Sequence, residues 1–256
     1  MSAVSPTITQ SSTSELLPSI GSELLRAESL FCERDERVLF EGLNFSINAG
    51  EIIQVEGPNG SGKTTLLRIM SGLSAAYEGE LFWKGELISS ARIEFLSNLL
   101  YLGHKPGVKA ILTPVENLRA LMGIRQSVTD EQIHSALEKV GLYGYEDVPC
   151  HNLSAGQHRR VALARLYLST DELWILDEAF TAIDKKGVKD LEALLQERAQ
   201  QGGAVLLTTH HELQIESGFK KLQLGKPVSN ESLARNEELV AEEVDTEAMV
   251  SRGGMR

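Results

Sequence analysis

One run of residues constrains the fold of this chain more than any other feature of the sequence. The run follows the pattern GxxxxGK[ST] and consists of Gly57, Pro58, Asn59, Gly60, Ser61, Gly62, Lys63, Thr64 and Thr65. It lies between an apolar stretch of strand length at 52–55 and an amphipathic stretch of helix length at 63–71. A glycine-rich turn that joins a strand to a helix in this way predicts an α/β fold.

The composition of this loop suits phosphate binding. Its glycines let the backbone curl so that several N–H groups point at phosphate oxygens, and the N-terminus of the following helix adds positive potential. We expect Lys63 to act in catalysis by reaching the β- and γ-phosphates of a nucleoside triphosphate, and the Thr64 hydroxyl to bind Mg²⁺. The alternative is a glycine-rich turn that binds nothing, and the flanking strand and helix disfavour it.

A second apolar stretch, at 173–176, ends in two acids, Asp177 and Glu178. The carboxyl ends of parallel strands are where ligands bind in open α/β sheets. We expect Asp177 to hold the hydration shell of Mg²⁺ and Glu178 to act as the general base on the attacking water. The alternative is that both acids only leave the strand for solvent and cap the next element.

Strands and helices alternate through the middle of the chain. Apolar runs of strand length occur at 52–55, 99–102, 173–176 and 204–207, and amphipathic segments of helix length occur at 63–71, 129–140, 155–168 and 185–200. This alternation predicts a parallel sheet covered on both faces. Residues 105–152 contain helical segments and no clear strand, which predicts a helical insertion in the core domain at 23–228.

The ends of the chain differ from this core in composition. Residues 1–22 are rich in Ser and Thr, and residues 229–256 are acidic. We expect a disordered N-terminal arm and a mobile acidic tail.

The overall composition excludes several classes of protein. Acidic residues outnumber basic ones 36 to 25, for a formal net charge of −11, which disfavours binding to nucleic acid. Cys32 and Cys150 form no CxxC pair, so neither a disulfide framework nor a structural zinc site is expected. We see no secretory signal and no apolar run of about 20 residues, so a role at a membrane requires partners.

A third motif lies at the start of the segment 155–168. It consists of Leu153, Ser154, Ala155, Gly156 and Gln157. Ser154 is a suitable N-cap, and we expect the basic residues of this helix to face outward while Val161, Leu163 and Leu168 pack. The simpler interpretation is a helix start and nothing more, but a second helix N-terminus is also a second anion site.

These five residues resemble the signature LSGGQ of the ABC (ATP-binding cassette) ATPases, with Ala155 in place of the usual first glycine. Together with the phosphate loop and the strand acids, the resemblance extends over about residues 23–226. It implies a P-loop NTPase core of the ABC type with a helical insertion subdomain. It also implies a dimer in which ATP lies between the phosphate loop of one subunit and Ser154, Gly156 and Gln157 of the other.

Two further segments fit this resemblance. The strand at 204–207 leads into a pair of histidines, of which His210 matches the histidine that contacts the γ-phosphate, with His211 as the alternative. Residues 179–184 resemble the D-loop without its usual proline and leucine, which implies that Asp184 faces the dimer seam.

Two positions depart from the family pattern. The aromatic residue that stacks on adenine is missing near Glu33 and Arg34, and either Arg34 or Arg37 is a candidate to stack through its guanidinium plane. His104 stands where the Q-loop glutamine is usual. Histidine binds a water on Mg²⁺ only when it is neutral, so we hypothesise that activity falls at low pH.

Three stretches look like one branch of the family, the ATP-binding subunits of bacterial cytochrome c maturation haem exporters. They lie at 34–40, 101–107 and 112–118. The resemblance implies membrane-spanning partner subunits seated on the helical insertion, a peripheral location at the cytoplasmic face of the inner membrane, and haem as the handled molecule. There is no CxxCH sequence, so no direct haem binding is expected from this chain.

Other functions within the same class remain as alternatives. They are the ATPase of another transporter and the ATPase of a soluble iron–sulfur cluster assembly complex. DNA-repair types carry long coiled-coil insertions and translation types carry two cassettes, and this chain has neither. A nucleotide-binding regulator without turnover is disfavoured by the intact Lys63, Asp177 and Glu178.

Overall fold

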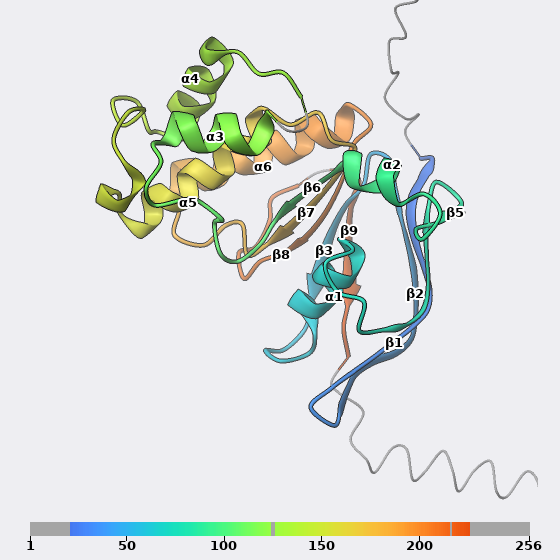
Figure 1. Ribbon diagram of the computed structural model, residues 1–256. Coiled ribbons are helices and arrows are strands. Elements are labelled where there is room, and N and C mark those ends of the chain that lie inside the picture. The colour runs from blue at the N-terminus through green and yellow to red at the C-terminus, as the bar shows by residue number, and fades with distance from the viewer. Residues whose placement is uncertain (1–20, 124–125, 216, 226–256) are drawn as a thin grey trace, which may run out of the picture.

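The computed structural model of the chain describes residues 21–123, 126–215 and 217–225 (Figure 1). The predicted acidic tail at 229–256 lies outside the described residues, as does the predicted N-terminal arm apart from Gly21 and Ser22. The described residues form a five-stranded sheet, a four-stranded sheet and a group of helices set to one side of both.

The five-stranded sheet contains every strand that was predicted. In spatial order its strands are β6 (Leu99–Leu102), β7 (Leu173–Asp177), β8 (Ala204–Thr208), β3 (Ile52–Glu56) and β9 (Phe219–Gln223), and neighbouring strands pair in parallel. β7 and β8 are buried along their whole length, as expected for strands covered on both faces. β9 was not predicted, because its two lysines interrupt the apolar pattern at the edge of the sheet.

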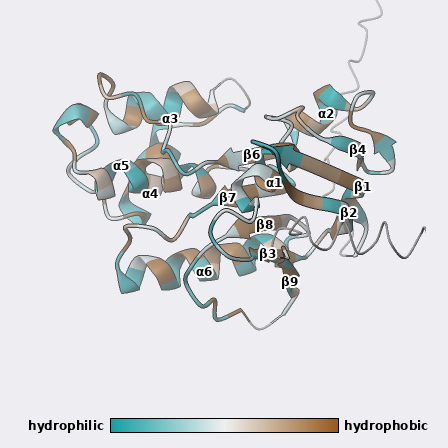
Figure 2. Ribbon diagram, turned by 90° about the horizontal axis from the view of Figure 1, so that it is seen from below, coloured by the Kyte–Doolittle hydropathy of each residue, from teal (hydrophilic) through white to brown (hydrophobic). Residues whose placement is uncertain are grey.

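The two faces of this sheet belong to different hydrophobic clusters. Leu173 and Ile175 of β7 pack with α1 (Lys63–Met70) and with the second sheet. Trp174 and Leu176 point the other way and pack with α6 (Lys185–Gln200). Because successive side chains of a strand alternate between faces, each strand serves both clusters. Figure 2 shows the hydrophobic strands between α6 on one side and α1 on the other.

The four-stranded sheet was not predicted from the sequence. Its spatial order is β2 (Arg37–Asn48), β1 (Glu23–Arg34), β4 (Glu78–Trp83) and β5 (Glu86–Leu87), and the pairs are antiparallel. The β1–β2 register shifts at several points, and such irregularities break the two-residue alternation by which a strand is recognised. Helix α2 (Arg92–Ser97) links this sheet to β6.

The described part of the segment 105–152 contains no strand, and its helical elements are α3 (Pro114–Met122), α4 (Asp130–Lys139) and the 3₁₀ turn η1 (Cys150–Asn152), joined by turns and loops. These helices share a core cluster with α5 (Ala155–Ala164), which follows at once. Each of the three α-helices starts with a capping box, at Thr113, Thr129 and Ser154, so each start is encoded locally.

One expectation about α5 was wrong. The predicted helical stretch near 155–168 is present as α5, which ends at Ala164 and continues as the short 3₁₀ turn η2 (Arg165–Tyr167). Its basic residues do not all face outward, because Arg159 has only 4% of its surface exposed. The helix lies against the carboxyl end of β7, where the backbone carbonyls of Asp177 and Glu178 accept hydrogen bonds from the Arg159 guanidinium.

Among the described residues, the longest and most apolar helices still fall short of what crossing a bilayer requires.

Candidate active site

The phosphate loop joins β3 to α1, and two of its glycines are needed for different reasons. Gly62 precedes α1 with φ of 92°, a left-handed conformation that favours glycine. A Cβ atom added at Gly57 would lie 2.6 Å from the Ser61 Oγ and 2.9 Å from the Leu224 carbonyl oxygen. Glycine is therefore favoured at position 62 by the backbone conformation and at position 57 by the close approach of Ser61 and Leu224.

The interior of the curl holds polar groups suited to an anion. The Lys63 Nζ donates to the carbonyl oxygens of Gly57 at 2.8 Å and Pro58 at 3.1 Å, so its ammonium lies across the loop. The Ser61 hydroxyl is buried and has no hydrogen-bond partner among the described residues. A cation and an orphaned hydroxyl at a helix N-terminus fit the phosphates of a nucleotide.

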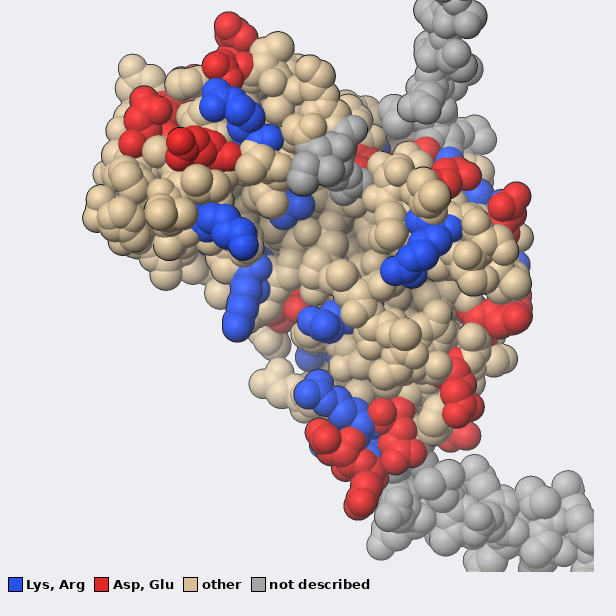
Figure 3. Space-filling view, viewed as in Figure 1, with Lys and Arg blue, Asp and Glu red and all other residues tan. Residues whose placement is uncertain are grey.

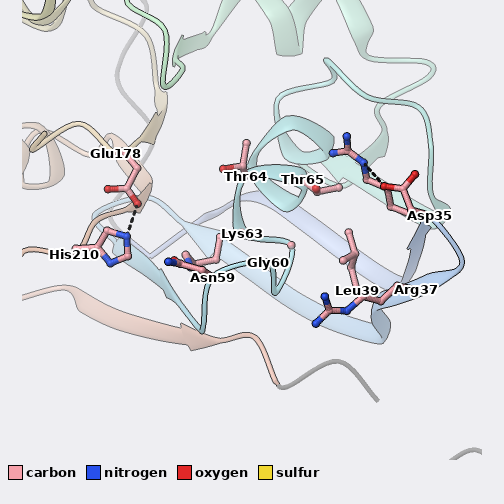
Figure 4. A pocket seen from close by; sticks show the side chains of 12 residues that line it. Asp35, Arg37, Leu39, Asn59, Gly60, Lys63, Thr64, Thr65, Glu178 and His210 are labelled. Carbon is pink, nitrogen blue, oxygen red and sulfur yellow. Dashed lines mark ion pairs between the residues drawn. The ribbon is translucent and has the colours of Figure 1, made fainter. Parts of the chain in front are cut away.

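A cleft of about 570 Å³ opens beside this loop (Figure 4). It brings together residues from β1 and β2 of the antiparallel sheet, from the phosphate loop and the start of α1, and from the loops after β7 and β8. The lining residues are Arg34, Asp35, Arg37, Leu39, Asn59, Gly60, Gly62, Lys63, Thr64, Thr65, Glu178 and His210. The cleft therefore joins the two predicted strand-end motifs to the phosphate loop.

The two predicted metal ligands lie next to each other. The Thr64 hydroxyl donates to Asp177 Oδ1 at 3.2 Å, although the two residues belong to α1 and β7. Asp177 is 1% exposed, and its second carboxylate oxygen is buried without a hydrogen-bond partner among the described residues. Carboxylate and hydroxyl oxygens are the protein ligands that Mg²⁺ takes, so this pair fits a magnesium site.

Glu178 and His210 lie next to each other on one side of the cleft. The His210 Nε2 lies 3.6 Å from Glu178 Oε1, and Figure 4 shows both side chains beside Lys63 and Asn59. His211, the alternative, turns away: its Nε2 lies 3.5 Å from Glu192 Oε1 on α6, and its ring stacks on Phe180 at 5.6 Å. Of the two histidines, His210 is the one that lines the cleft beside the phosphate loop.

The predicted adenine contacts lie at one end of the cleft. Asp35 and Glu36 have φ of 53° and 59°, so they form a tight turn between β1 and β2 that places Arg34 opposite Arg37. Arg37 approaches the phosphate loop, because a Cβ atom on Gly60 would lie 3.9 Å from its Nη1. Arg34 pairs with Asp35 at 3.6 Å.

The remaining predicted site residues do not line this cleft. Ser154 and Gln157 exchange hydrogen bonds in the capping box of α5, and Gly156 lies near the Ala182 carbonyl. The side chain of His104 is exposed. Within a single copy of the chain, these residues are therefore separate from the phosphate loop.

Asp184 also lies outside the cleft and is the N-cap residue of α6. Its Oδ1 accepts the Gly187 N–H at 2.8 Å and so caps α6, and its Oδ2 lies 3.2 Å from the Arg160 guanidinium. The hydrogen bond from the Gly187 N–H lowers the pKa of Asp184 below its ordinary value, and the positive charge of Arg160 lowers it further.

Three residues around the site were missed by sequence analysis: Tyr101, Arg159 and Thr208. Thr208 ends β8 and is the register partner of Asp177, which a correct strand alignment would have revealed. Burial raises the pKa of the Tyr101 hydroxyl, and the negative charge of Asp177 raises it further. Arg159 donates hydrogen bonds to the backbone carbonyls of Asp177 and Glu178. No signal in the sequence distinguishes it from the surface arginines.

Comparison with known proteins identifies the relatives of this chain. The family model described as ABC transporter matches residues 40–181, more than half of the chain. The chain is 61% identical over 202 residues to the cytochrome c biogenesis ATP-binding export protein CcmA of Hahella chejuensis, covering 79% of this chain and 96% of that protein. It is 57% identical over 204 residues to the protein of the same name from Aliivibrio fischeri, covering 79% and 100%.

Solved structures confirm the predicted fold. An ATP-binding subunit of an ABC transporter superposes with a TM-score of 0.68 at 22% identity, covering 84% of this chain and 94% of that one. A dimeric ATP-binding cassette, in a post-hydrolysis state with ADP and Pi, superposes with a TM-score of 0.66 at 21% identity, covering 79% and 97%. Since the family model spans most of the parallel-sheet core and the relatives match over nearly their whole length, the chain is an ATPase subunit of the ABC transporter family and belongs to its CcmA branch.

Proposed function

We propose that this chain hydrolyses ATP to drive export in cytochrome c biogenesis at the bacterial inner membrane, with haem as the handled molecule. The observation that carries the proposal is the match to export proteins of that name, at up to 61% identity and over nearly their full length. The cleft supplies the chemistry that such a subunit needs.

ATP binding follows from the phosphate loop. The triphosphate takes the place inside the curl of residues 57–65, where backbone N–H groups and the Ser61 hydroxyl donate to it. Lys63 exchanges the carbonyls of Gly57 and Pro58 for the β- and γ-phosphate oxygens. The adenine lies toward the β1–β2 turn, against the guanidinium plane of Arg34 or Arg37.

Thr64 and Asp177 are the proposed ligands of Mg²⁺, directly or through its hydration shell. The bound ion neutralises charge on the phosphate oxygens. The hydroxyl of Thr208 donates to Asp177 Oδ1 at 2.8 Å, which holds the carboxylate in one orientation and leaves its other oxygen for the ion.

Glu178 and His210 are the proposed groups that act on the reacting atoms. A water molecule attacks the γ-phosphorus, its proton passes to the Glu178 carboxylate, and the bond to the ADP oxygen breaks. His210 donates a hydrogen bond to the γ-phosphate and lies next to Glu178. The neighbouring Lys63 stabilises the negative charge on the transferred phosphoryl group.

A second copy of the chain completes the site in this proposal. Ser154, Gly156 and Gln157 of that copy close over the nucleotide, and Asp184 lies at the seam between the copies. The exposed start of α5 supports this arrangement, because it presents a capped helix N-terminus to the outside. A solved structure of the same fold is a dimer with bound ADP and Pi, which supports a paired arrangement.

The chain acts, in this proposal, at the cytoplasmic face of the membrane with membrane-spanning partner subunits on its helical region. We expect no direct haem contact and no nucleic-acid binding. On the face shown in Figure 3, acidic side chains gather mainly at the lower end and the edges while Lys and Arg lie toward the middle. The net charge of −11 opposes binding to phosphate polymers.

Deletion of the gene, with complementation, tests the proposed role. Cells that lack the chain should lose mature c-type cytochromes, the unaltered chain should restore them, and the Lys63→Ala variant should not. Purification of the tagged chain from membranes should retain membrane-spanning proteins. Normal cytochromes in the deletion strain would contradict the role in biogenesis. Co-purification with a soluble scaffold would favour cluster assembly instead.

A further inference from the structure

Arg159 is a buried cation whose hydrogen bonds go to backbone carbonyls around the catalytic acids. It lies on α5, five residues after Ser154, and is 4% exposed. Its Nη1 donates to the carbonyl of Gly103 at 2.9 Å, and its Nη2 donates to the carbonyls of Asp177 at 3.1 Å and Glu178 at 2.7 Å. One guanidinium therefore joins α5 to two segments that are distant in the sequence.

Burial of Arg159 disfavours the charged form of its guanidinium. Burial lowers the pKa of Arg159, and the negative charges of Asp177 and Glu178 offset only part of that effect. Its Nε is buried and has no hydrogen-bond partner among the described residues. An arginine buried in this way costs stability, and here it makes its hydrogen bonds with the backbone of both acids.

The backbone that Arg159 contacts is itself constrained. Glu178 has φ of 54°, a left-handed conformation that is unfavourable for a residue other than glycine. Its N–H donates to the Thr208 hydroxyl at 3.0 Å, and its carbonyl accepts from Arg159. The residue is thus held on both sides, and in this conformation its carboxylate faces His210 at 3.6 Å.

We propose that Arg159 is a positioning residue for ATP hydrolysis, which holds the backbone of Glu178 so that its carboxylate points at the attacking water. The inference rests on the proposed role of Glu178 as the base. Because Arg159 belongs to the helix whose first turn covers the partner's nucleotide in the proposed dimer, it links that helix to the base. Its hydrogen bond to the Gly103 carbonyl also links the segment after β6 to the backbone of Glu178.

The geometry explains why an arginine is needed. The two terminal nitrogens donate in different directions, one to the segment after β6 and the other to the end of β7. Lysine carries a single ammonium on a flexible stem and has no planar fork. Arg159→Lys should keep the charge and lose one of the two links.

Arg198 is a matched control. It is also a buried arginine, 5% exposed, and it donates to the backbone carbonyls of Thr170 and Asp171, away from the cleft. Burial lowers its pKa as it does that of Arg159. Replacement of either arginine removes a buried guanidinium with carbonyl partners, so a loss specific to Arg159 reports on the active site.

The test measures ATP hydrolysis by the full chain, together with the membrane proteins that co-purify with it. Arg159→Lys and Arg159→Met should lower kcat by about tenfold or more while KM for ATP changes by less than about twofold, because the phosphate loop is untouched. Arg198→Lys and Arg198→Met should lower the Tm and leave kcat within about twofold. Unchanged kcat in Arg159→Lys would overturn the inference. So would failure of both Arg159 variants to fold while the Arg198 variants fold.

A double variant separates this inference from the proposed role of Glu178. In the Glu178→Gln background, Arg159→Lys should cause no further loss of the residual single-turnover rate, because two residues that act as a unit are not additive. A multiplicative loss would show that Arg159 acts elsewhere. Normal turnover by Glu178→Gln alone would refute the role of Glu178 as base. An inactive Glu178→Gln with normal turnover by Arg159→Lys would refute only the inference about Arg159.

Discussion

The Thr208 hydroxyl donates a hydrogen bond of 2.8 Å to the Asp177 carboxylate, and the two residues are register partners at the ends of β8 and β7. The same hydroxyl accepts the Glu178 N–H at 3.0 Å. One threonine on the neighbouring strand therefore contacts both acids of the site. The sheet register, rather than the acids' own strand, orients the proposed metal ligand relative to the proposed base.

Lys63→Ala should abolish hydrolysis. The variant loses a charge-assisted hydrogen bond to the phosphates, worth about 1.5–3 kcal/mol, which corresponds to about a ten- to hundredfold loss before any change in geometry. Phosphate release from ATP measures the effect, and Lys189→Ala, on the exposed part of α6, is the control. Full activity in the Lys63 variant would refute the role of the loop.

Glu178→Gln should bind ATP, hydrolyse it about a hundred- to ten-thousandfold more slowly, and accumulate as a dimer. Size-exclusion chromatography with and without ATP detects the dimer, and phosphate release gives the rate. Glu192→Gln is the matched control, because Glu192 pairs with His211 as Glu178 pairs with His210. A normal rate in the Glu178 variant would show that another group is the base.

His210→Ala and His211→Ala should differ. The first removes the histidine that lines the cleft, and kcat should fall by about ten- to a hundredfold through the loss of a hydrogen bond to a charged phosphate. The second removes the stacking on Phe180 and should affect the Tm more than kcat. The reverse order of effects on kcat would assign the γ-phosphate contact to His211.

Arg34→Ala and Arg37→Ala should distinguish the two candidate adenine contacts. Loss of stacking between a guanidinium and adenine is worth about 0.5–1 kcal/mol, so the Kd for ATP should rise by about two- to fivefold in the variant of the stacking residue. Arg92→Ala, on exposed α2, is the control. Titration with a fluorescent ATP analogue gives the Kd, and unchanged binding in both variants would place adenine elsewhere.

The rate of hydrolysis should fall between about pH 8 and 6 if His104 binds a water on the ion. Protonation at low pH removes the lone pair that this contact needs, and His104→Gln should abolish the dependence. In the described structure the side chain is exposed and lies outside the lining of the cleft, so the contact requires closure of the site. A flat rate over this range in the unaltered chain would remove the hypothesis.

The sequence by itself determined the features that depend on neighbouring residues. The phosphate loop, the buried run that ends at Asp177 and Glu178, and the capping box at Ser154 are each specified within a few positions. Their local backbone conformations follow from glycine, from apolar runs of strand length, and from a polar cap before a helix. The α/β class was predictable for the same reason.

Only the tertiary structure decided how these local pieces meet. In the antiparallel sheet, β1 and β2 pair with an irregular register, which breaks the alternation of buried and exposed residues by which a strand is recognised in a sequence. The choice of His210 over His211 as the residue lining the cleft, the burial of Arg159 and the contact of Thr208 with Asp177 depend on which distant backbone lies next to each side chain. The sequence determined the local conformations, and long-range strand pairing and packing decided which of those residues share one cleft.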